Sequence, residues 1–265
     1  MLDRFDRPIT YLRISVTDKC NLRCTYCMPA EGVPPRAHGE FLTLEQVTEV
    51  ARAAVGLGVT KIRLTGGEPL VKRGIVDLVR MIGALAGLEH LAMTTNGVLL
   101  GGVARSLKDA GLDSVNVSLD TLDPGRYRLL TRGGEIGRAL EGIRAAVAAG
   151  LPVKVNMVVL EDTGPGEIER LRDWCAGLGV RLQLINHYDL SREKGERYAF
   201  DRPPSCGACN RIRLMADGML KPCLHSDQEI PLDFSRLTES LREAILSKPR
   251  RGGACTNRVM TQIGG

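Results

Sequence analysis

Short apolar, strand-like runs alternate with amphipathic, helix-like runs through the first two thirds of the chain. The strand-like runs cover residues 11–16, 61–65, 90–95, 114–119, 153–160 and 180–185, and the helix-like runs cover residues 43–55, 74–86, 103–110, 136–149 and 167–177. Thr43 and Gln46 have the spacing of a capping box at the start of the first helix. This alternation predicts an α/β fold, an incomplete (βα)6 parallel barrel of the TIM-barrel type.

Three cysteines, Cys20, Cys24 and Cys27, follow the first predicted strand in a CxxxCxxC spacing. A loop of this length can place three thiolates on one inorganic cluster, which leaves one of four irons open. Zinc with a distant fourth ligand and disulfide pairing are the alternatives. Residues 1–10 are polar and lack the apolar core of a signal peptide. We therefore expect a cytoplasmic protein, in which disulfides are rare.

The composition of the chain argues against binding to nucleic acids and to membranes. The formal net charge is only +5, and aromatic residues make up 4% of the chain. Base-stacking platforms need aromatic side chains beside basic ones, so we expect no nucleic-acid partner. No apolar stretch approaches the ~20 residues that span a bilayer, so we expect no membrane association.

Polar motifs stand where the predicted strands end, which is the working face of such barrels. The sequence Gly66-Gly67-Glu68-Pro69 follows the second strand, and residues 94–97 and 116–120 occupy the ends of the third and fourth. Glycines let the backbone approach a ligand closely, and Pro69 biases Glu68 toward an extended conformation. The motifs predict a ligand site beside the three cysteines.

A second cysteine group, Cys206, Cys209 and Cys223, follows the barrel pattern. A CxxC pair with a third cysteine beyond a hairpin signal at residues 216–218 indicates a metal or cluster site. Zinc stays open here because His225 or Cys255 could supply a fourth ligand. We divide the chain into a barrel, residues 1–188, and a C-terminal cluster-binding appendix, residues 189–265. The amphipathic helix 237–246 is expected to pack this appendix onto the barrel or to form a dimer face.

Several of these motifs carry a resemblance to known families. CxxxCxYC, with Tyr26 as its aromatic, together with GGEP resembles the radical S-adenosylmethionine superfamily. The run Cys209-Asn210-Arg211-Ile212-Arg213-Leu214, the third cysteine and the final Gly264-Gly265 resemble the molybdenum cofactor biosynthesis protein A family of GTP 3′,8-cyclases. This resemblance covers residues 11–185 and 204–265, and the chain looks like a shortened member.

The resemblance implies two [4Fe-4S] clusters and S-adenosylmethionine as cofactors, and a role for each matching residue. The cluster ligands are Cys20, Cys24 and Cys27 for the first cluster and Cys206, Cys209 and Cys223 for the second. Cofactor contacts fall on Tyr26, Gly67, Ser118 and Tyr188, and GTP contacts on Arg13, Arg63, Thr94, Lys154, Arg211 and Arg213. The catalytic set is Arg13, Arg211, Arg213, Gly264 and Gly265. Arg13, Arg63 and Lys154 also stand out by themselves, because each lies inside an apolar strand where a charge needs a partner.

The reaction implied is the conversion of GTP to 3′,8-cyclo-7,8-dihydro-GTP, the first step of molybdenum cofactor biosynthesis. In the family a radical derived from S-adenosylmethionine removes the hydrogen at C3′, and C3′ then joins C8 of the guanine. The implied partners are GTP, an electron donor such as flavodoxin or ferredoxin, and a downstream cyclic pyranopterin synthase; a homodimer stays open.

The chain departs from the family pattern at three places. Residues 189–205 replace a segment that is several tens of residues longer in the family. Tyr188 stands where the family has a methionine that packs on the adenine, and Gln183 stands where an arginine is usual. Two other functions therefore stay open: a radical enzyme of this architecture acting on a different nucleotide, cofactor precursor or peptide, and a non-catalytic metal-stabilised binding protein. Cys175 is expected in the core and Cys255 as a free thiol.

Overall fold

The computed structural model describes residues 1–34, 36–195, 199–200 and 205–264 of the chain. In this described part, nine strands form one sheet in the order β6-β5-β4-β3-β2-β1-β7-β8-β9. The strands are β1 Tyr11–Ser15, β2 Lys61–Thr65, β3 His90–Thr95, β4 Ser114–Ser118, β5 Val153–Val159, β6 Arg181–Asn186, β7 Arg211–Leu214, β8 Met219–Lys221 and β9 Ile230–Pro231. Strands β1 to β7 are parallel, whereas β8 and β9 are antiparallel additions at one edge.

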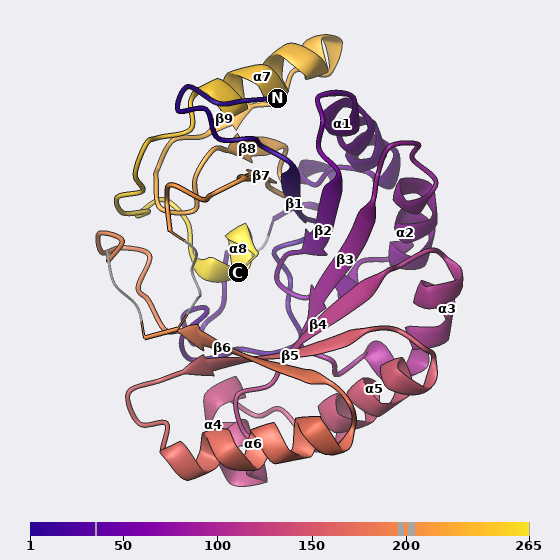
Figure 1. Ribbon diagram of the computed structural model, residues 1–265, viewed down its shortest axis with the longest axis vertical. Coiled ribbons are helices and arrows are strands. Elements are labelled where there is room, and N and C mark those ends of the chain that lie inside the picture. Colours follow the sequence, from indigo (N-terminus) through magenta and orange to yellow (C-terminus); the bar gives the residue numbers. More distant parts are fainter. Residues whose placement is uncertain (35, 196–198, 201–204, 265) are drawn as a thin grey trace.

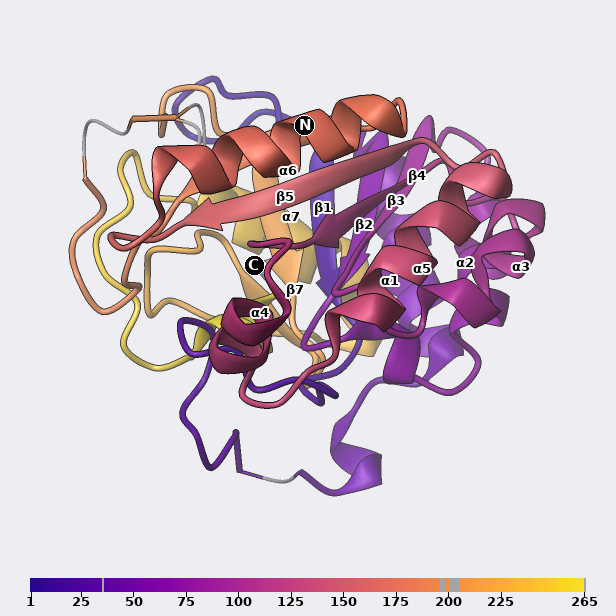
Figure 2. The same ribbon diagram turned by 90° about the horizontal axis from the view of Figure 1, so that it is seen from below.

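Helices cover the outer face of the curved sheet (Figure 1). They are α1 Leu44–Gly56, α2 Ile75–Gly83, α3 Ala104–Asp109, α4 Pro124–Thr131, α5 Ile136–Ala148, α6 Pro165–Gly177, α7 Leu237–Leu246 and α8 Met260–Ile263, with short 3₁₀ turns at His38–Glu40, Pro69–Val71, Leu100–Gly102 and Phe234–Arg236. Figure 2 shows α6 along the outer side of β5, while α8 and the C-terminal end lie inside the curve in Figure 1. The predicted incomplete parallel barrel is confirmed.

Local sequence signals explain the start of the first helix. The Thr43 hydroxyl accepts a hydrogen bond from the Gln46 amide at 3.2 Å, and the Gln46 side chain accepts one from the Thr43 amide at 2.9 Å. The capping box read from the sequence is therefore present, and it satisfies two amides that the helix itself cannot.

Helix α4 was not expected from the sequence. Its start is well signalled, because Asp123 caps the Arg126 amide at 2.6 Å and Pro124 occupies the first turn. Its C-terminal end holds the first cysteine loop: the amides of Arg23 and Thr25 donate to the carbonyls of Thr131 and Leu130 at 3.1 and 2.9 Å. This short helix thus fixes the backbone on which the first cysteines stand.

The main core lies between the sheet and its helices. Leu12, Ile14, Ile62 and Leu64 are fully buried there, and burial of such side chains is the dominant stabilising contribution. Cys175 is 1% exposed in this core, as predicted, and burial raises the pKa of its thiol to about 11.

Residues beyond the barrel pattern extend the same sheet. Strand β7 pairs in parallel with β1, and the predicted hairpin to β8 is present with Arg213 opposite Lys221. Helix α7 packs against α1, β8 and β9, which confirms its expected packing onto the barrel. The division into two parts at residue 188 stays a prediction. In the part of the chain that the structure describes, no helix is long and apolar enough to cross a membrane.

Candidate active site

Two rows of polar side chains cross the three central strands of the sheet. The register places Arg211, Tyr11 and Lys61 in one row, and Arg213, Arg13 and Arg63 in the next. Because the rows are two residues apart along each strand, both point to the same face of the sheet. That face is the inside of the barrel.

The rows line a cavity of about 340 Å³ inside the barrel. Its lining comprises Tyr11, Arg13, Lys61, Arg63, Thr94, Asn116, Lys154, Asn156, Gln183, Ile185, Tyr188, Asn210, Arg211, Arg213 and Leu224. All six residues expected to contact GTP are among them. The lining holds six cationic side chains and no carboxylate, so we call it the cationic cavity.

Crowded charges shift the pKa values of groups in the cationic cavity. Burial, followed by the neighbouring charges of Arg213, Arg63 and Arg211, lowers the pKa of Arg13 to about 9. Although burial alone would raise it, the charges of Arg13, Arg63 and Arg211 lower the pKa of Tyr11 to about 8. A polyanion entering the cavity would relieve this repulsion.

Hydrogen bonds hold part of this charge in place. Arg63 donates from Nε to the Tyr11 hydroxyl at 2.7 Å, and from Nη1 to the carbonyl of Met93 and the hydroxyl of Thr94 at 3.1 and 3.2 Å. By contrast, the buried Nε of Arg211 has no hydrogen-bond partner among the described residues. A buried donor without a partner is costly, and a phosphate oxygen would satisfy it.

The C-terminal tail reaches the edge of the cationic cavity. Arg13 and Arg213 both donate to the carbonyl oxygen of Gly264, at 3.2 and 3.0 Å, and Ser15 donates to the carbonyl of Gln262 at 3.0 Å. Gly264 has φ +71°, and a Cβ there would lie 2.5 Å from Thr65 Cγ2. Only glycine fits this position. Gly265, also predicted in the site, lies outside the described residues.

The first cysteine group lines an adjoining cavity of about 170 Å³. Its lining includes Cys20, Cys24 and Cys27 together with all four residues expected to contact the cofactor, Tyr26, Gly67, Ser118 and Tyr188. Thr94, Asn156, Ile185 and Tyr188 line both this cavity and the cationic cavity. The two spaces therefore meet at these side chains.

The glycines of the GGEP motif have a packing role that the sequence did not reveal. A Cβ on Gly66 or Gly67 would lie 2.4 Å from the carbonyl oxygen of Thr17 or Lys19. The amides of Gly67 and Glu68 donate to those same carbonyls at 2.8 and 2.9 Å. The motif is thus joined directly to the cysteine loop.

Glu68 ties this motif to the next strand end. Its backbone is extended, as Pro69 predicts, and its buried carboxylate accepts from the amides of Leu70 and Asn96 and from the Thr95 hydroxyl at 2.7–2.9 Å. Burial raises the pKa of Glu68 to about 7. The ends of β2 and β3 are thereby joined beside the first cysteine group.

The first three thiols suit ligation to iron cations. Burial, followed by the charge of Cys20, raises the pKa of Cys27 to about 12, and burial with the charges of Cys27, Asp120 and Cys20 raises that of Cys24 further. By themselves these buried thiols resist ionisation, whereas iron cations would stabilise three thiolates together.

Tyr26 is fixed by a buried acid. Its hydroxyl donates to Asp120 at 2.6 Å, and the other oxygen of Asp120 accepts from the Val158 amide at 2.8 Å. Burial raises the pKa of Asp120 to about 6. The His187 ring stands edge-on to Tyr26, with centroids 6.3 Å apart. The aromatic of the cysteine motif is therefore held in one orientation.

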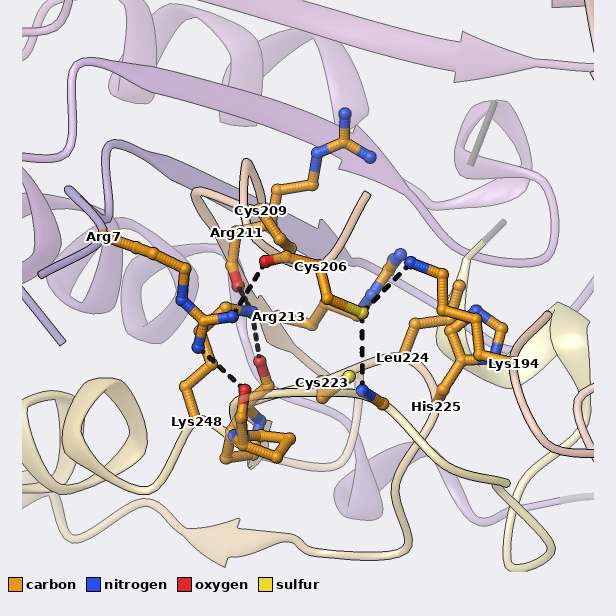
Figure 3. Close-up of a pocket in the computed structure, with 13 residues that line it drawn as sticks. Arg7, Lys194, Cys206, Cys209, Arg211, Arg213, Cys223, Leu224, His225 and Lys248 are labelled. Atoms are coloured by element: carbon orange, nitrogen blue, oxygen red, sulfur yellow. Dashed lines mark hydrogen bonds between the residues drawn. The ribbon is translucent and has the colours of Figure 1, made fainter. Parts of the chain in front are cut away.

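The second cysteine group lines another pocket, which Figure 3 shows. Arg211, Arg213 and Leu224 line both spaces. Lys194 donates to the Cys206 sulfur at 3.3 Å, and Arg7 to the Cys206 carbonyl at 2.9 Å. The cationic cavity thus lies between the two cysteine groups.

Positive charge surrounds this second group. Although burial would raise it, the charge of Lys248 and the Arg211 amide lower the pKa of Cys209. Lys248 itself is anchored on the carbonyls of Arg211 and Pro222 at 2.7 and 3.0 Å. Thiolates, and an anionic cluster bound to them, are favoured in this setting.

The side chains of each cysteine group do not converge on one point in the described structure. Within the described ranges, no three His, Cys, Asp or Glu side chains are arranged to hold a single metal ion. Ligands of a four-iron cluster each bind a different iron, so they need not converge on one point. Cys255 does not line the second pocket; it packs with Leu190, Met215 and Ile263.

Sequence reasoning missed several residues of these cavities. Tyr11 and Lys61 lie two residues from Arg13 and Arg63, so strand periodicity could have identified them. Arg7, Lys194 and Lys248 reach the second pocket from distant segments, and no local signal marks them.

The fold and the cysteine sites together define a radical S-adenosylmethionine protein, and the model of the Radical SAM superfamily matches residues 14–175. Full-length relatives narrow the class further. The chain is 41% identical to a GTP 3′,8-cyclase of Alkaliphilus oremlandii, with all of both chains covered, and 42% identical to one of Peptoclostridium acidaminophilum, with 98% of that protein covered. The chain belongs to the GTP 3′,8-cyclase family.

Solved structures show the same fold. Streptococcus suis SuiB bound to its precursor peptide SuiA matches with a TM-score of 0.69 at 18% identity, over 92% of this chain and 66% of SuiB. The protein anSMEcpe with bound AdoMet matches with a TM-score of 0.66 at 15% identity, over 88% of this chain and 81% of that one. At such identities the likeness concerns the fold alone.

Proposed function

We propose that this chain converts GTP to 3′,8-cyclo-7,8-dihydro-GTP in the first step of molybdenum cofactor biosynthesis. The observation that carries the proposal is the cationic cavity itself. Six cations and no carboxylate line it, and it lies between two cysteine groups. A nucleoside triphosphate brings the negative charge that this lining needs, and its ribose and base can reach toward opposite ends.

The residues present fit the two [4Fe-4S] clusters and the S-adenosylmethionine that the family implies. Cys20, Cys24 and Cys27 would hold the first cluster, and Cys206, Cys209 and Cys223 the second. S-adenosylmethionine would contact Tyr26, Gly67, Ser118 and Tyr188, all of which line the first cavity. Bound together, the first cluster and S-adenosylmethionine supply hydrogen-atom abstraction from an unactivated carbon.

The arginines and Lys154 of the cationic cavity bind and orient the nucleotide. The planar fork of Arg211 can grip two phosphate oxygens, and its Nε is free of other partners in the described structure. Arg63 and Thr94, joined at 3.2 Å, contact the substrate near the opening to the first cavity. This placement directs C3′ of the ribose toward the first cysteine group.

Arg13 and Arg213 act through the tail as well as through their charge. By holding Gly264 against Thr65 and Gly66, they close the space beside the substrate and exclude water. Excluding water strengthens each electrostatic contact in the cavity. Joining C3′ to C8 leaves a radical on the guanine that takes up one electron and one proton, and the positive charges of Arg13 and Arg213 favour the arrival of that electron.

Gln183 should bind the phosphates of GTP more weakly than the arginine that the family has at this position. It lines the cationic cavity where the family has an arginine. The alignment with the first relative above spans 320 positions for a chain of 265 residues, so the relative carries segments that this chain lacks. The alternative substrate is therefore a different nucleotide or cofactor precursor, and turnover of such compounds is to be compared with turnover of GTP.

The reaction also defines partners and a location for this chain. Reductive chemistry at the first cluster needs an electron donor, such as flavodoxin or ferredoxin, and the cyclic product needs a cyclic pyranopterin synthase to consume it. We place the chain in the cytoplasm, with its substrate. A homodimer is compatible with two exposed apolar side chains, Phe234 in the 3₁₀ turn before α7 and Leu246 at the end of α7.

Anaerobic reconstitution tests the proposal. About eight irons per chain are expected, with 5′-deoxyadenosine and a cyclic GTP product formed on adding GTP, S-adenosylmethionine and a strong reductant. ATP and UTP serve as matched substrates, and Arg138→Ala, on the exposed face of α5, is the control for Arg211→Ala. Deoxyadenosine without a GTP product would overturn the assigned substrate, and zinc in place of iron would overturn the enzyme itself.

A further inference from the structure

His225 is a buried imidazole that nothing in the described structure satisfies. It is 4% exposed, and neither Nδ1 nor Nε2 has a hydrogen-bond partner among the described residues. Buried ring nitrogens normally have partners, because leaving one unpaired costs the full desolvation penalty. An unpaired imidazole in a pocket therefore calls for a ligand.

The pocket that His225 enters is the one with the second cysteine group. His225 follows Cys223 by two residues and lines the same space as Cys206, Cys209 and Cys223. Figure 3 shows its ring beside Lys194, on the side of Cys206 and Cys223 away from Cys209 in this view. Three sulfurs and one nitrogen thus surround a common space.

Neighbouring groups fix the imidazole in position. A Cβ on Gly252 would lie 2.8 Å from His225 Cβ and 3.2 Å from the Cys223 sulfur, so the backbone there packs tightly on both. The Gly253 amide donates to the His225 carbonyl at 2.8 Å. On the other side, the Tyr188 ring packs on the imidazole, with centroids 5.2 Å apart. The ring is pre-positioned rather than free.

The rest of the pocket lining offers the imidazole no other kind of acceptor or metal-binding group. Apart from the three cysteines, the side chains that line this pocket with His225 are cationic or apolar, and none is a carboxylate. Imidazole nitrogens are common metal ligands, and the second cluster is the metal group that this pocket would hold.

We propose that His225 is the fourth protein ligand of the second cluster in the substrate-free protein. A lone pair of the neutral imidazole forms the bond to the iron that the three cysteines leave open, and solvent leaves that iron, with no net change in electrons. This inference rests on the cluster assigned to Cys206, Cys209 and Cys223 in the proposed function, but not on GTP being the substrate.

Pulsed paramagnetic resonance of the reduced second cluster tests the inference. The full chain carries Cys20→Ala, Cys24→Ala and Cys27→Ala, so that only the second cluster remains, and is measured without GTP after growth with unlabelled or ¹⁵N-labelled histidine. A directly bonded nitrogen coupling that changes with the label is expected. It should vanish in His225→Leu and persist in His90→Gln, a control histidine that bonds Ser114 far from this pocket.

The reduction potential gives a second readout that does not require His225→Leu to fold. His225→Cys keeps a fourth ligand but replaces nitrogen with thiolate, so its potential is expected to fall below that of the parent protein. If iron is bound at Cys206, Cys209 and Cys223 but no nitrogen coupling changes with the label, the inference is overturned and the cluster assignment stands. If no iron is bound at these cysteines, both are overturned. Failure of GTP turnover would touch neither result, because these spectra are recorded without GTP.

Discussion

Arg213 donates a hydrogen bond to the carbonyl oxygen of Gly264 over 3.0 Å, which joins strand β7 to the C-terminal tail inside the barrel. Arg13, from the adjacent strand β1, donates to the same oxygen. Two guanidinium groups that line the cationic cavity thus hold the same carbonyl of the tail. The tail is therefore expected to control what the cavity can hold.

Gly264→Ala is expected to lower formation of the cyclic product at least about tenfold, because the added methyl group would meet Thr65 and Gly66 at a positive φ. Global stability should change by less than about 2 kcal/mol, since the affected contact is local. Product formation and thermal unfolding measure the two effects. Gly137→Ala, where a Cβ meets nothing within 4 Å, is the matched control. Equal activities in the two variants would contradict a role for the tail.

Arg211→Lys keeps the charge but loses the planar fork. We expect the KM for GTP to rise about tenfold, equivalent to about 1.4 kcal/mol of lost binding. Steady-state kinetics under anaerobic conditions measure this change. An unchanged KM would show that Arg211 does not grip the phosphates, and Arg138→Ala on the outer surface should leave KM unaltered.

Binding of GTP should weaken as pH rises through about 8. Tyr11 has its pKa lowered to about 8, so above this pH a phenolate adds negative charge to the cavity. This negative charge disfavours a polyanion. Tyr11→Phe removes the phenolate, so the GTP affinity of that variant should hold to higher pH. Anaerobic titrations from pH 7 to 9 compare the variants, and identical pH profiles would rule Tyr11 out as the titrating group.

Tyr26→Phe deletes the hydroxyl that donates to Asp120 and leaves a buried acid oxygen unpaired. We expect a loss of about 1–2 kcal/mol, measured as a lower unfolding midpoint. Tyr127→Phe is the matched control, because the Tyr127 hydroxyl has no hydrogen-bond partner in the described structure. If both variants unfold alike, the bond between Tyr26 and Asp120 is not stabilising.

The same pair predicts how stability depends on pH. Asp120 has a pKa of about 6 in the folded protein against 3.8 for an ordinary aspartate, so the folded state binds more protons between these values. The contribution of Asp120 to the free energy of unfolding therefore falls as pH rises from about 4 to 6. The hydrogen bond from Tyr26 lowers the pKa of Asp120, so Tyr26→Phe should raise this pKa. The free energy of unfolding of the variant should then keep falling to a higher pH. Unfolding midpoints at pH 5, 6 and 7 would show whether the slope changes.

Much of the fold could be predicted because its signals are local. The strand and helix runs reappear with end shifts of a few residues, and the Thr43 capping box is present as the sequence indicates. Helix α4 was missed because only Tyr127 and Thr131 are buried along it, so it lacks a strong apolar period. The Asp123-Pro124 pair is the local sequence signal that marks the start of this helix.

Site residues that lie in family motifs or stand out within a strand could be predicted from the sequence. Contacts between segments far apart in the sequence could not. Arg13, Arg63 and Lys154 could be singled out as charges within apolar strands, and they do share one cavity. The bond from Lys194 to Cys206, across the segment 195–205, has no counterpart in local pattern. The packing of Gly67 on Lys19 likewise depends on how two loops meet in space.

The central claim is that the cationic cavity presents C3′ of GTP to the first cysteine group, and isotope transfer tests it most directly. The reconstituted protein is given GTP carrying deuterium at C3′, with S-adenosylmethionine and reductant, and the 5′-deoxyadenosine is analysed by mass spectrometry. One deuterium in the deoxyadenosine, together with a cyclic product that has lost it, is the predicted result. Unlabelled deoxyadenosine with intact GTP would contradict the account.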